Sequence, residues 1–600
     1  MISPSSRPRV ERLASLPAAP RRAFARSMVE DPAGAMGRDH RLYASKWLTL
    51  VLCECVMLSS GTLYTFPIFS PALKRELALT QEEVNSVGSA AHFGAFFSVL
   101  GGLFFDAYGP RATLALGGAL KLGGLSMMAG VITGSLPRSR ALAAACGYVF
   151  GTGCSTSLTA CLGANYATFR DRAVHGRLVG LLLSFFGLSS GVFSLIYDVF
   201  FSDPTSFVRF LALFAGGVDL LASRLVGHPK HLALPGDAIE LRSKVSGVVP
   251  RRGAWAARVA SFFQDARAET KLGRGLAACA AIAAHVAVAA AFVGATGASS
   301  WAAFACLLAL VLLFAAQFGT LLGGSGRLVF RRADMENVDA TRSGEAEDVG
   351  DSEASRGGGA SAARQHLGPA EMVATLDFWL VFASFFLALG SGVTVINNLS
   401  QMVSAYPSIP DPSATSRGLL KLLACANTLG RLAAGALSDR LAGKVGRVPF
   451  TAACIAGMAA GFLALFALGG GDGDGGEASG GAHVAFGLFP PLFGLAVGTI
   501  IVGACFGALF WAMPLLTMEL FGSRHFGANR GVLGLSPAIG GYAMSTALAG
   551  RVYAANAGND NECDRGGACY RLAWVADVVA CAVACAACVW LAKRRGQWRW

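Results

Sequence analysis

The chain has 600 residues, of which 54% are hydrophobic and only 14% are charged. A soluble globular domain is normally about a quarter charged, so this composition excludes an ordinary soluble protein. The formal net charge of +13 would by itself fit a nucleic-acid partner. The positions of the basic residues therefore have to decide what that charge means.

The apolar residues fall into runs of about 20, the length that an α-helix needs to cross a bilayer core of roughly 30 Å. The 75 glycines agree with this, because small residues let membrane helices approach closely. We therefore predict an all-α polytopic membrane protein. Its fourteen predicted spans are residues 47–68, 84–105, 112–134, 140–162, 178–200, 207–227, 275–295, 300–322, 373–396, 418–438, 448–469, 493–515, 530–553 and 572–592.

The basic residues are unequally divided between the two sides of these spans. With the N-terminus in the cytosol, most of the 50 Lys and Arg fall in inner loops and tails, whereas the outer loops hold only seven. That asymmetry follows the positive-inside rule, so we expect both termini in the cytosol. We therefore expect the chain to be embedded in a lipid bilayer and not to bind nucleic acid. The sequence favours neither the plasma membrane nor an organellar membrane.

The segments outside the spans differ in composition. Residues 1–46 hold nine Lys and Arg and no apolar core for a signal peptide, so they are either an organellar presequence or, as we favour, a disordered basic tail. The basic linker 228–274 is either an interfacial helix or a solvated connection. The loop 323–372 is acidic and rich in Gly and Ser, which predicts disorder. Residues 593–600 form a second basic tail.

Two stretches on the inner side occur twice in the chain. The turn Gly102-x-x-x-Asp106 is repeated as Gly435-x-x-x-Asp439, and the loop 165–177 is repeated as 519–530. Because both repeats keep their order, the chain contains two halves built on one plan. Internal repeats of this kind are typical of secondary transporters.

The repeats also divide the chain. We predict a six-helix N-terminal half over residues 47–227 and a six-helix C-terminal half over residues 373–592. Two further helices, within residues 275–322, are inserted between the halves.

Prolines and cysteines mark the outer side. Pro67 and Pro71 are expected to end the first helix near the outer surface, because proline breaks helices. Cys563 and Cys569 lie in the last outer loop, where a disulfide is expected if that compartment is oxidising. Most of the other cysteines lie within spans, where we interpret them as packing residues rather than metal ligands.

Arg431 is the most informative ionisable residue, because it lies inside a predicted span. A charge at the bilayer centre costs at least about 2.5–3.5 kcal/mol and usually has a function. One hypothesis is a clamp for an anionic substrate, with the guanidinium binding a carboxylate. The alternative is a gate residue paired with Asp439 or with carbonyls at a helix end. The sequence favours neither.

Other ionisable residues in the spans leave similar alternatives. Glu54 could be a proton-coupling carboxylate, or it could form a structural pair with Lys121 or reach the cytosolic interface, which we slightly favour. Lys121 is more strongly expected to be structural. Asp219 and Arg224 are expected at the cytosolic interface of the sixth helix.

Several polar residues complete the candidates. Asn397, Asn398 and Gln401 cluster at the outer end of the ninth span, where they could equally bind a polar solute or fix an outer gate. His92 and His285 are single histidines on apolar helices, for which a structural role is expected.

One stretch resembles the signature helix of nodulin-like proteins, a branch of the major facilitator superfamily. It runs from Leu376-Asp377-Phe378-Trp379 to Asn397-Asn398-Leu-Ser-Gln401. Four further motifs resemble the same family. They are Asn165 with Gly176-Arg177, Phe186-Gly187, Pro514 through Glu519-Leu-Phe-Gly522, and the loop with Cys563 and Cys569-Tyr570. The resemblance covers about 45–230 and 372–592. It implies two six-helix bundles that transport a solute by alternating access, and the two extra central helices also occur in such proteins.

The repeated turns then resemble the cytoplasmic gating motif of the superfamily. The resemblance assigns this role to seven residues, namely Gly102, Asp106, Gly109, Arg111, Gly435, Asp439 and Arg447. The match is looser in the second half, where Gly443 comes one residue late.

The helix of Arg431 also resembles that of monocarboxylate transporters, in which an aspartate and an arginine bind a proton and a carboxylate. Asn427 stands here in place of the aspartate, and Ile68 stands in place of a lysine at the end of the first helix. Asn427 cannot titrate, so the arginine is expected to bind an anion without a proton beside it.

Together these features predict a secondary active transporter for a small, monocarboxylate-like organic anion, with a proton as a candidate coupling ion. The alternative is a non-transporting receptor or scaffold that signals through residues 228–274 and 333–368. We predict no enzyme, because no nucleophile–base pair or metal-ligand spacing is present, and neither cofactor nor metal is expected. The glycine-rich segment at 469 lacks the Lys-Ser/Thr of a phosphate loop, which argues against ATP-driven transport.

Overall fold

The computed structural model describes residues 46–79, 81–169, 171, 174–226, 270–286, 288–289, 300–322, 366–442, 444–469, 491–558 and 563–597. All of them belong to one packed unit of the chain, and within these ranges the ordered elements are helices. The predictions for residues 1–45, for nearly all of the linker 228–274 and for most of the loop 323–372 lie outside the described residues.

Helices follow the predicted spans through the N-terminal half. In chain order they are α2 (Lys46–Ser60), η2 (Gly61–Thr65), α3 (Phe66–Leu77), α4 (Gln81–Phe96), α5 (Val99–Thr133), α6 (Arg140–Thr168), α7 (His175–Phe200) and α8 (Pro204–Leu225). The predicted span 84–105 covers α4 and the start of α5, whereas the span 112–134 lies in the rest of α5, beyond a kink at Gly109. Gly109 has φ 76°, a left-handed conformation that glycine adopts without strain.

The first span ends at Thr65, next to Pro67, as predicted, but the prediction that Pro71 also ends a helix is wrong. The chain instead passes through the 3₁₀ turn η2 and continues as α3 to Leu77, with Pro71 inside the helix. Pro67 lies in the first turn of α3, where a missing N–H costs nothing because no helical carbonyl awaits it. The proline therefore starts a helix here.

The C-terminal half repeats this arrangement. Its elements are α12 (Pro369–Val373), α13 (Leu376–Ser404), α14 (Pro412–Leu441), α15 (Arg447–Leu468), α16 (Pro491–Phe521), α17 (Phe526–Leu533), α18 (Leu535–Gly541), η7 (Tyr542–Ala549), α19 (Gly550–Asn556), η8 (Gly566–Cys569) and α20 (Arg571–Arg594). The predicted span 530–553 thus combines α17, α18, the π-helical turn η7 and α19. Of the inserted pair, residues 270–286 are helical and α11 covers Ser300–Leu322.

Ten helices among the described residues are long and apolar enough to cross a membrane, and one of them, Ser86–Thr133, covers two predicted spans. The predicted spans 140–162 and 418–438 lie in α6 and α14, which are not among the ten. The reason is their composition: α6 is rich in Gly, Ser and Thr, and α14 carries charged residues. Helices that face other helices instead of lipid can be this polar.

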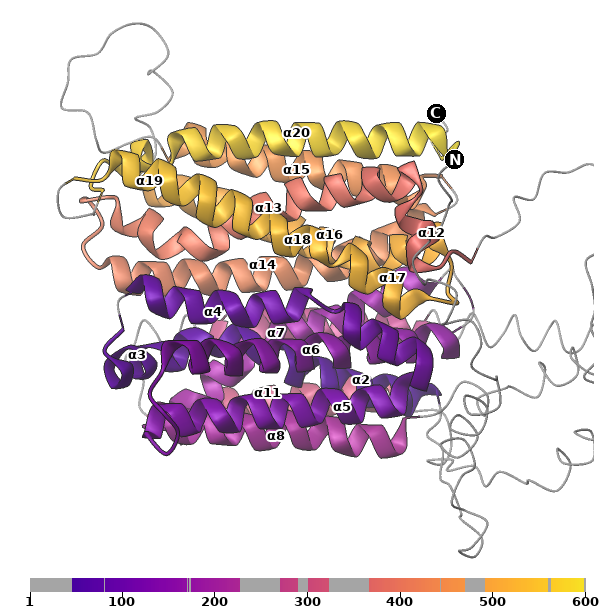
Figure 1. Cartoon of the computed structure of the whole chain (residues 1–600), viewed down its shortest axis with the longest axis horizontal. Coiled ribbons are helices and arrows are strands. Elements are labelled where there is room, and N and C mark those ends of the chain that lie inside the picture. Colours follow the sequence, from indigo (N-terminus) through magenta and orange to yellow (C-terminus); the bar gives the residue numbers. More distant parts are fainter. Residues whose placement is uncertain are drawn as a thin grey trace, which may run out of the picture. The chain divides into compact units, whose positions relative to one another are not determined.

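Figure 1 shows the helices of each half gathered together, the first half in indigo to magenta and the second in orange to yellow. Within the N-terminal half α5 packs on α6 and α8, and within the C-terminal half α16 packs on α14 and α15. The two halves meet where α7 packs on α14 and where α17 packs on α5. The inserted α11 packs on α7 and α2.

Candidate functional site

Asp106, near the start of α5, binds the backbone of the other half. Its two carboxylate oxygens accept hydrogen bonds from the N–H groups of Gly527 (2.9 Å) and Ala528 (2.8 Å), at the start of α17. A Cβ on Gly102, one turn earlier, would lie 2.0 Å from the Gly527 carbonyl oxygen. Only glycine at position 102 therefore lets α5 and α17 approach this closely.

Asp439, near the end of α14, makes the reciprocal contact. Its carboxylate accepts hydrogen bonds from the N–H groups of Gly176 (3.0 Å) and Arg177 (2.8 Å), at the start of α7. A Cβ on Gly435 would lie 2.5 Å from the Gly176 carbonyl oxygen. Each half therefore places a carboxylate on the free N–H groups of a helix in the other half, where a negative charge is favoured.

The basic residues of the two turns differ in what they bind. Arg447 forms an ion pair with Asp439 (3.1 Å) and a second one with Glu519. The Nε of Arg177 lies 3.7 Å from the Asp439 carboxylate. Arg111 instead donates a hydrogen bond from Nε to the Val226 carbonyl (2.7 Å) and so ties α5 to the end of α8 within one half.

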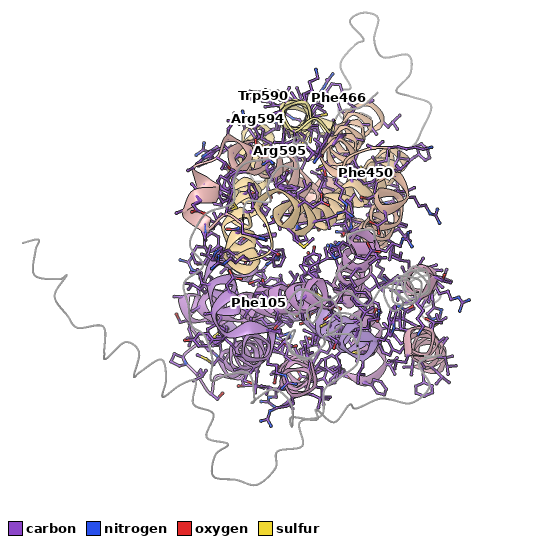
Figure 2. The ribbon with its side chains drawn as sticks, turned by 90° about the vertical axis from the view of Figure 1, so that its right-hand side faces the viewer. Phe105, Phe450, Phe466, Trp590, Arg594 and Arg595 are labelled. Carbon is purple, nitrogen blue, oxygen red and sulfur yellow. A yellow bond between two sulfur atoms is a disulfide. The ribbon has the colours of Figure 1, made fainter. Side chains whose placement is uncertain are left out.

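Figure 2 views the molecule along its helices and labels Phe105 in the N-terminal half. The Phe105 ring fills the space over Gly163 of α6 and also reaches Gly527 of α17. We call this end of the helices, with the turns 102–111 and 435–447, the paired-turn end.

Arg594 and Arg595, also labelled in Figure 2, form ion pairs with Asp377 at the start of α13.

Arg431 is 1% exposed and lies at the contact of the two halves. Its Nη1 donates a hydrogen bond to the Leu183 carbonyl of α7 (2.5 Å), whereas Nε and Nη2 have no hydrogen-bond partner among the described residues. A pairing with Asp439 is therefore wrong, because Arg447 and Arg177 occupy that carboxylate. The carbonyl that Arg431 does bind lies within α7, not at a helix end.

Aromatic side chains from both halves surround this guanidinium. Its carbon lies 5.5 Å from the ring centre of Phe510 (α16) and 6.0 Å from that of Phe186 (α7), within the range of cation–π attraction. Tyr64 of η2 faces the guanidinium, and its ring lies 5.5 Å from Phe186 and 6.1 Å from His92. We call Tyr64, His92, Phe186, Arg431 and Phe510 the Arg431 cluster.

Asn427 lies one turn before Arg431 and is also buried. Its side-chain oxygen has no hydrogen-bond partner among the described residues and faces α16, where a Cβ on Gly507 would lie 3.0 Å from it. Asn427 and Arg431 thus share a buried helix, and no hydrogen bond joins their described side chains.

Lys121 and Asp219 form a buried ion pair of 2.7 Å, with both side chains 0% exposed. Lys121 also donates to the hydroxyls of Ser59 and Ser60 (3.0 Å each), and Asp219 accepts from Ser59 (3.1 Å) and Ser157. Of the alternatives for Glu54, the pair with Lys121 is therefore wrong, and so is the expected interfacial position of Asp219. The packing of α8 on α5 decides this, because Gly118 leaves room for the Asp219 side chain, whose Cβ would lie 2.9 Å from a Cβ at position 118.

Glu54 faces the inserted helices. Its carboxylate is fully buried and has no hydrogen-bond partner among the described residues. The side chain that faces it most closely is Gln317 of α11, and Cys279 of the other inserted helix is also near. Glu54 is thus oriented toward the inserted pair. Arg224, by contrast, is exposed in the last turn of α8.

The amide cluster joins two helices of the C-terminal half. Asn397 donates to the Ser545 hydroxyl (3.0 Å), and Asn398 donates to the Thr394 carbonyl (2.9 Å) and the Ser545 carbonyl (3.3 Å). These bonds tie α13 to η7, and Gln401 lies partly buried one turn later.

The remaining candidates are local. His285 shares a hydrogen bond with the Cys306 carbonyl (2.9 Å) and so joins the two inserted helices. Cys563 and Cys569 form a disulfide with a Cα–Cα distance of 6.1 Å. In the described part of the chain, no group of three or more His, Cys, Asp or Glu side chains is arranged to hold a metal ion.

Three groups of residues were missed by the sequence analysis. Arg530 of α17 is buried and donates to the Thr159 hydroxyl of the other half (2.7 Å). Asp577 is a fully buried acid in α20. A listing of every charged residue inside a predicted span would have found both. The aromatic members of the Arg431 cluster carry no such signal, because aromatic residues are common throughout the spans.

Known proteins resemble parts of this chain. A protein of Neurospora crassa described as "Probable transporter mch1" is 28% identical over 249 residues, which are 37% of this chain and 39% of that protein. The protein of the same description from Aspergillus fumigatus is 27% identical over 36% of each chain. The chain thus spans little more than a third of the length of these curated relatives.

Two solved structures also resemble the fold described here. The major facilitator transporter FucP in its outward conformation aligns with 91% of this chain and 99% of its own, at a TM-score of 0.45 and 13% identity. The proton:xylose symporter XylE aligns with 90% of this chain and 94% of its own, at a TM-score of 0.49 and 13% identity.

The family comparison agrees with the resemblance seen in the sequence. The nodulin-like family model matches residues 46–234, which are α2 to α8 and the residues that follow them. This is the half that contributes Asp106, the start of α7 and the aromatic face toward Arg431. The N-terminal part of the chain, residues 46–234, is thus similar to the nodulin-like family.

Proposed function

We propose that this protein is a secondary active transporter that moves a small organic anion across a membrane by alternating access. The observation that carries the proposal is the reciprocal contact of Asp106 with α17 and of Asp439 with α7. We call these two contacts the latches. Breaking and re-forming them would open and close one side of a transport path between the two halves. The relatives described as probable transporters support the same function.

The positive-inside rule assigns the paired-turn end to the cytosol. In the arrangement described, the latches at this end are closed, so the path would be open or occluded toward the other side. Opening to the cytosol requires four backbone N–H groups to leave the two carboxylates. Hydrogen bonds to charged groups contribute about 1.5–3 kcal/mol each, so this equilibrium can be shifted by substrate binding.

The substrate class follows from Arg431. Two of its three nitrogens have no hydrogen-bond partner among the described residues, although the Tyr64 side chain faces them. A guanidinium stays charged even when buried. Its free donors match a carboxylate, and Phe186 and Phe510 supply apolar surface for a short carbon skeleton. A small organic monocarboxylate fits both demands. The residues of the superfamily gating motif, at the paired-turn end, then form a gate on the cytosolic side of this site.

Arg431→Lys and Arg431→Ala test the substrate proposal. Loss of one partner of a buried charge pair costs about 2–5 kcal/mol, so Arg431→Ala should weaken substrate binding roughly 30-fold or more. Arg431→Lys should recover little, because an ammonium cannot make the bidentate contact. Uptake of a panel of monocarboxylates into proteoliposomes is the measurement. Arg224→Lys, at an exposed arginine, is the matched control.

Normal anion uptake by both Arg431 variants would exclude the clamp. A thermal-stability screen of the purified protein against the same panel gives an independent readout, because a ligand of the folded state raises the melting temperature.

A further inference from the structure

The last helix of each half carries a buried aspartate that faces a serine of the first helix of that half. In the N-terminal half Asp219 of α8 accepts a hydrogen bond from Ser59 of α2 (3.1 Å). In the C-terminal half the Ser391 hydroxyl of α13 faces Asp577 of α20. Both aspartates are 0% exposed. The two halves therefore share an acid–serine contact at equivalent helices.

The two acids differ in whether a nearby cation neutralises the carboxylate. Lys121 of α5 lies 2.7 Å from Asp219 and neutralises it, and Ser157 donates a further hydrogen bond. Neither carboxylate oxygen of Asp577 has a hydrogen-bond partner among the described residues. The corresponding third helix of the C-terminal half is α15, which presents Cys454 near this interface and no lysine.

Among the described residues, the titratable group that interacts with Asp577 is the thiol of Cys581 in α20, and Cys581 in turn interacts with Cys505 of α16. Arg571, almost two turns earlier in α20, places its guanidinium 5.1 Å from the Phe466 ring centre instead. An ionised carboxylate at this position would thus have neither a cation nor a full set of donors, which burial makes costly.

We propose that Asp577 is a proton-binding site of the C-terminal half and that it carries its proton in the arrangement described here. The neutral acid can donate its O–H to the Ser391 hydroxyl oxygen, and no charge is then left in the helix interface. The proton comes from water when α13 and α20 are accessible and returns to water when the acid ionises. The proposal adds a proton to the ligands of the proposed transporter, but it does not depend on Arg431.

The test is the melting temperature of the purified full-length protein in detergent, without substrate, from mildly acidic to mildly alkaline pH. The wild type should lose stability as the pH rises, because ionisation of Asp577 is penalised only in the folded state. Asp577→Asn should match the wild type at acidic pH and should lose that part of the pH dependence. Asp219→Asn is the matched control: it leaves Lys121 unpaired and should lower the melting temperature at every pH.

The proposal is overturned if Asp577→Asn lowers the melting temperature at acidic pH as much as Asp219→Asn does, or if it keeps the pH dependence of the wild type. Ser391→Ala gives a second readout should the asparagine variant fail to fold. It removes the hydroxyl that can donate to the ionised form, so ionisation in the folded state needs a higher pH. The loss of stability should therefore continue to a higher pH than in the wild type. An unshifted curve contradicts the proposal.

A sodium titration at fixed pH separates a proton from an alkali cation. If sodium raises the melting temperature of the wild type but not of Asp577→Asn, the site binds that cation and the proton proposal is wrong. Because none of these measurements uses substrate, failure here leaves the anion-uptake test of Arg431 standing, and the reverse also holds.

Discussion

At the scale of single residues, burial decides which charges belong together. Lys121 has Asp219 and two serine hydroxyls as partners, whereas Glu54 faces Gln317 across the contact with the inserted helices. In the sequence these residues are simply ionisable groups in spans. The distinction between a neutralised pair and a lone acid comes entirely from which helices pack together.

Lys121→Met should strongly destabilise the protein. It leaves the Asp219 carboxylate buried without its cation, and breaking one partner of a buried ion pair costs about 3–5 kcal/mol. Denaturant or thermal unfolding in detergent is the measurement, with the exposed Arg224→Met as control. The double variant Lys121→Met with Asp219→Leu should recover much of the loss. A single variant as stable as the wild type would show that the pair adds nothing.

At the scale of elements, glycines set the distance between the halves. A Cβ on Gly102 would lie 2.0 Å from the Gly527 oxygen, and one on Gly435 would lie 2.5 Å from the Gly176 oxygen. Backbone atoms cannot give way as a flexible side chain can. The helix contacts that carry the two latches therefore depend on small residues at these positions.

Gly102→Ala should shift the protein toward the state that is open at the paired-turn end. The added methyl group cannot fit against α17, so Asp106 loses its contact with Gly527 and Ala528. Accessibility of a cysteine introduced at this end to a membrane-impermeant reagent measures the shift. Gly217→Ala is the matched control, because a Cβ there meets nothing within 4 Å. Equal accessibility in both variants would contradict the gate.

At the scale of the whole molecule, the two halves exchange the same kind of contact, on which the proposed function rests. One carboxylate of each half caps a helix of the other, so the halves are linked by equivalent bonds that can break together. The inserted α11 packs on α7 and α2. Neither latch includes a residue of the inserted helices or of the loop after them.

Deletion of residues 333–368 separates transport from scaffolding. If the two halves carry the function, uptake by the deletion variant should stay near that of the wild type. If instead the chain is a scaffold, the deletion should abolish partner binding. Uptake in proteoliposomes and partner capture from intact membranes are the two measurements, and a variant that folds but no longer transports would contradict the proposed function.

The sequence by itself determined the all-helical membrane class and most helix positions, and its resemblance to nodulin-like proteins agrees with the family model over residues 46–234. The division into two related halves is a prediction from the repeated turns. Hydrophobic run length and repeated turns are local properties of the sequence, so they can be recognised without a three-dimensional structure. The tertiary structure alone decided the partners of the buried charges. Arg431 binds the Leu183 carbonyl, Asp439 pairs with Arg447, and Lys121 pairs with Asp219. Such partners lie on different helices, and only helix packing brings them within hydrogen-bond distance.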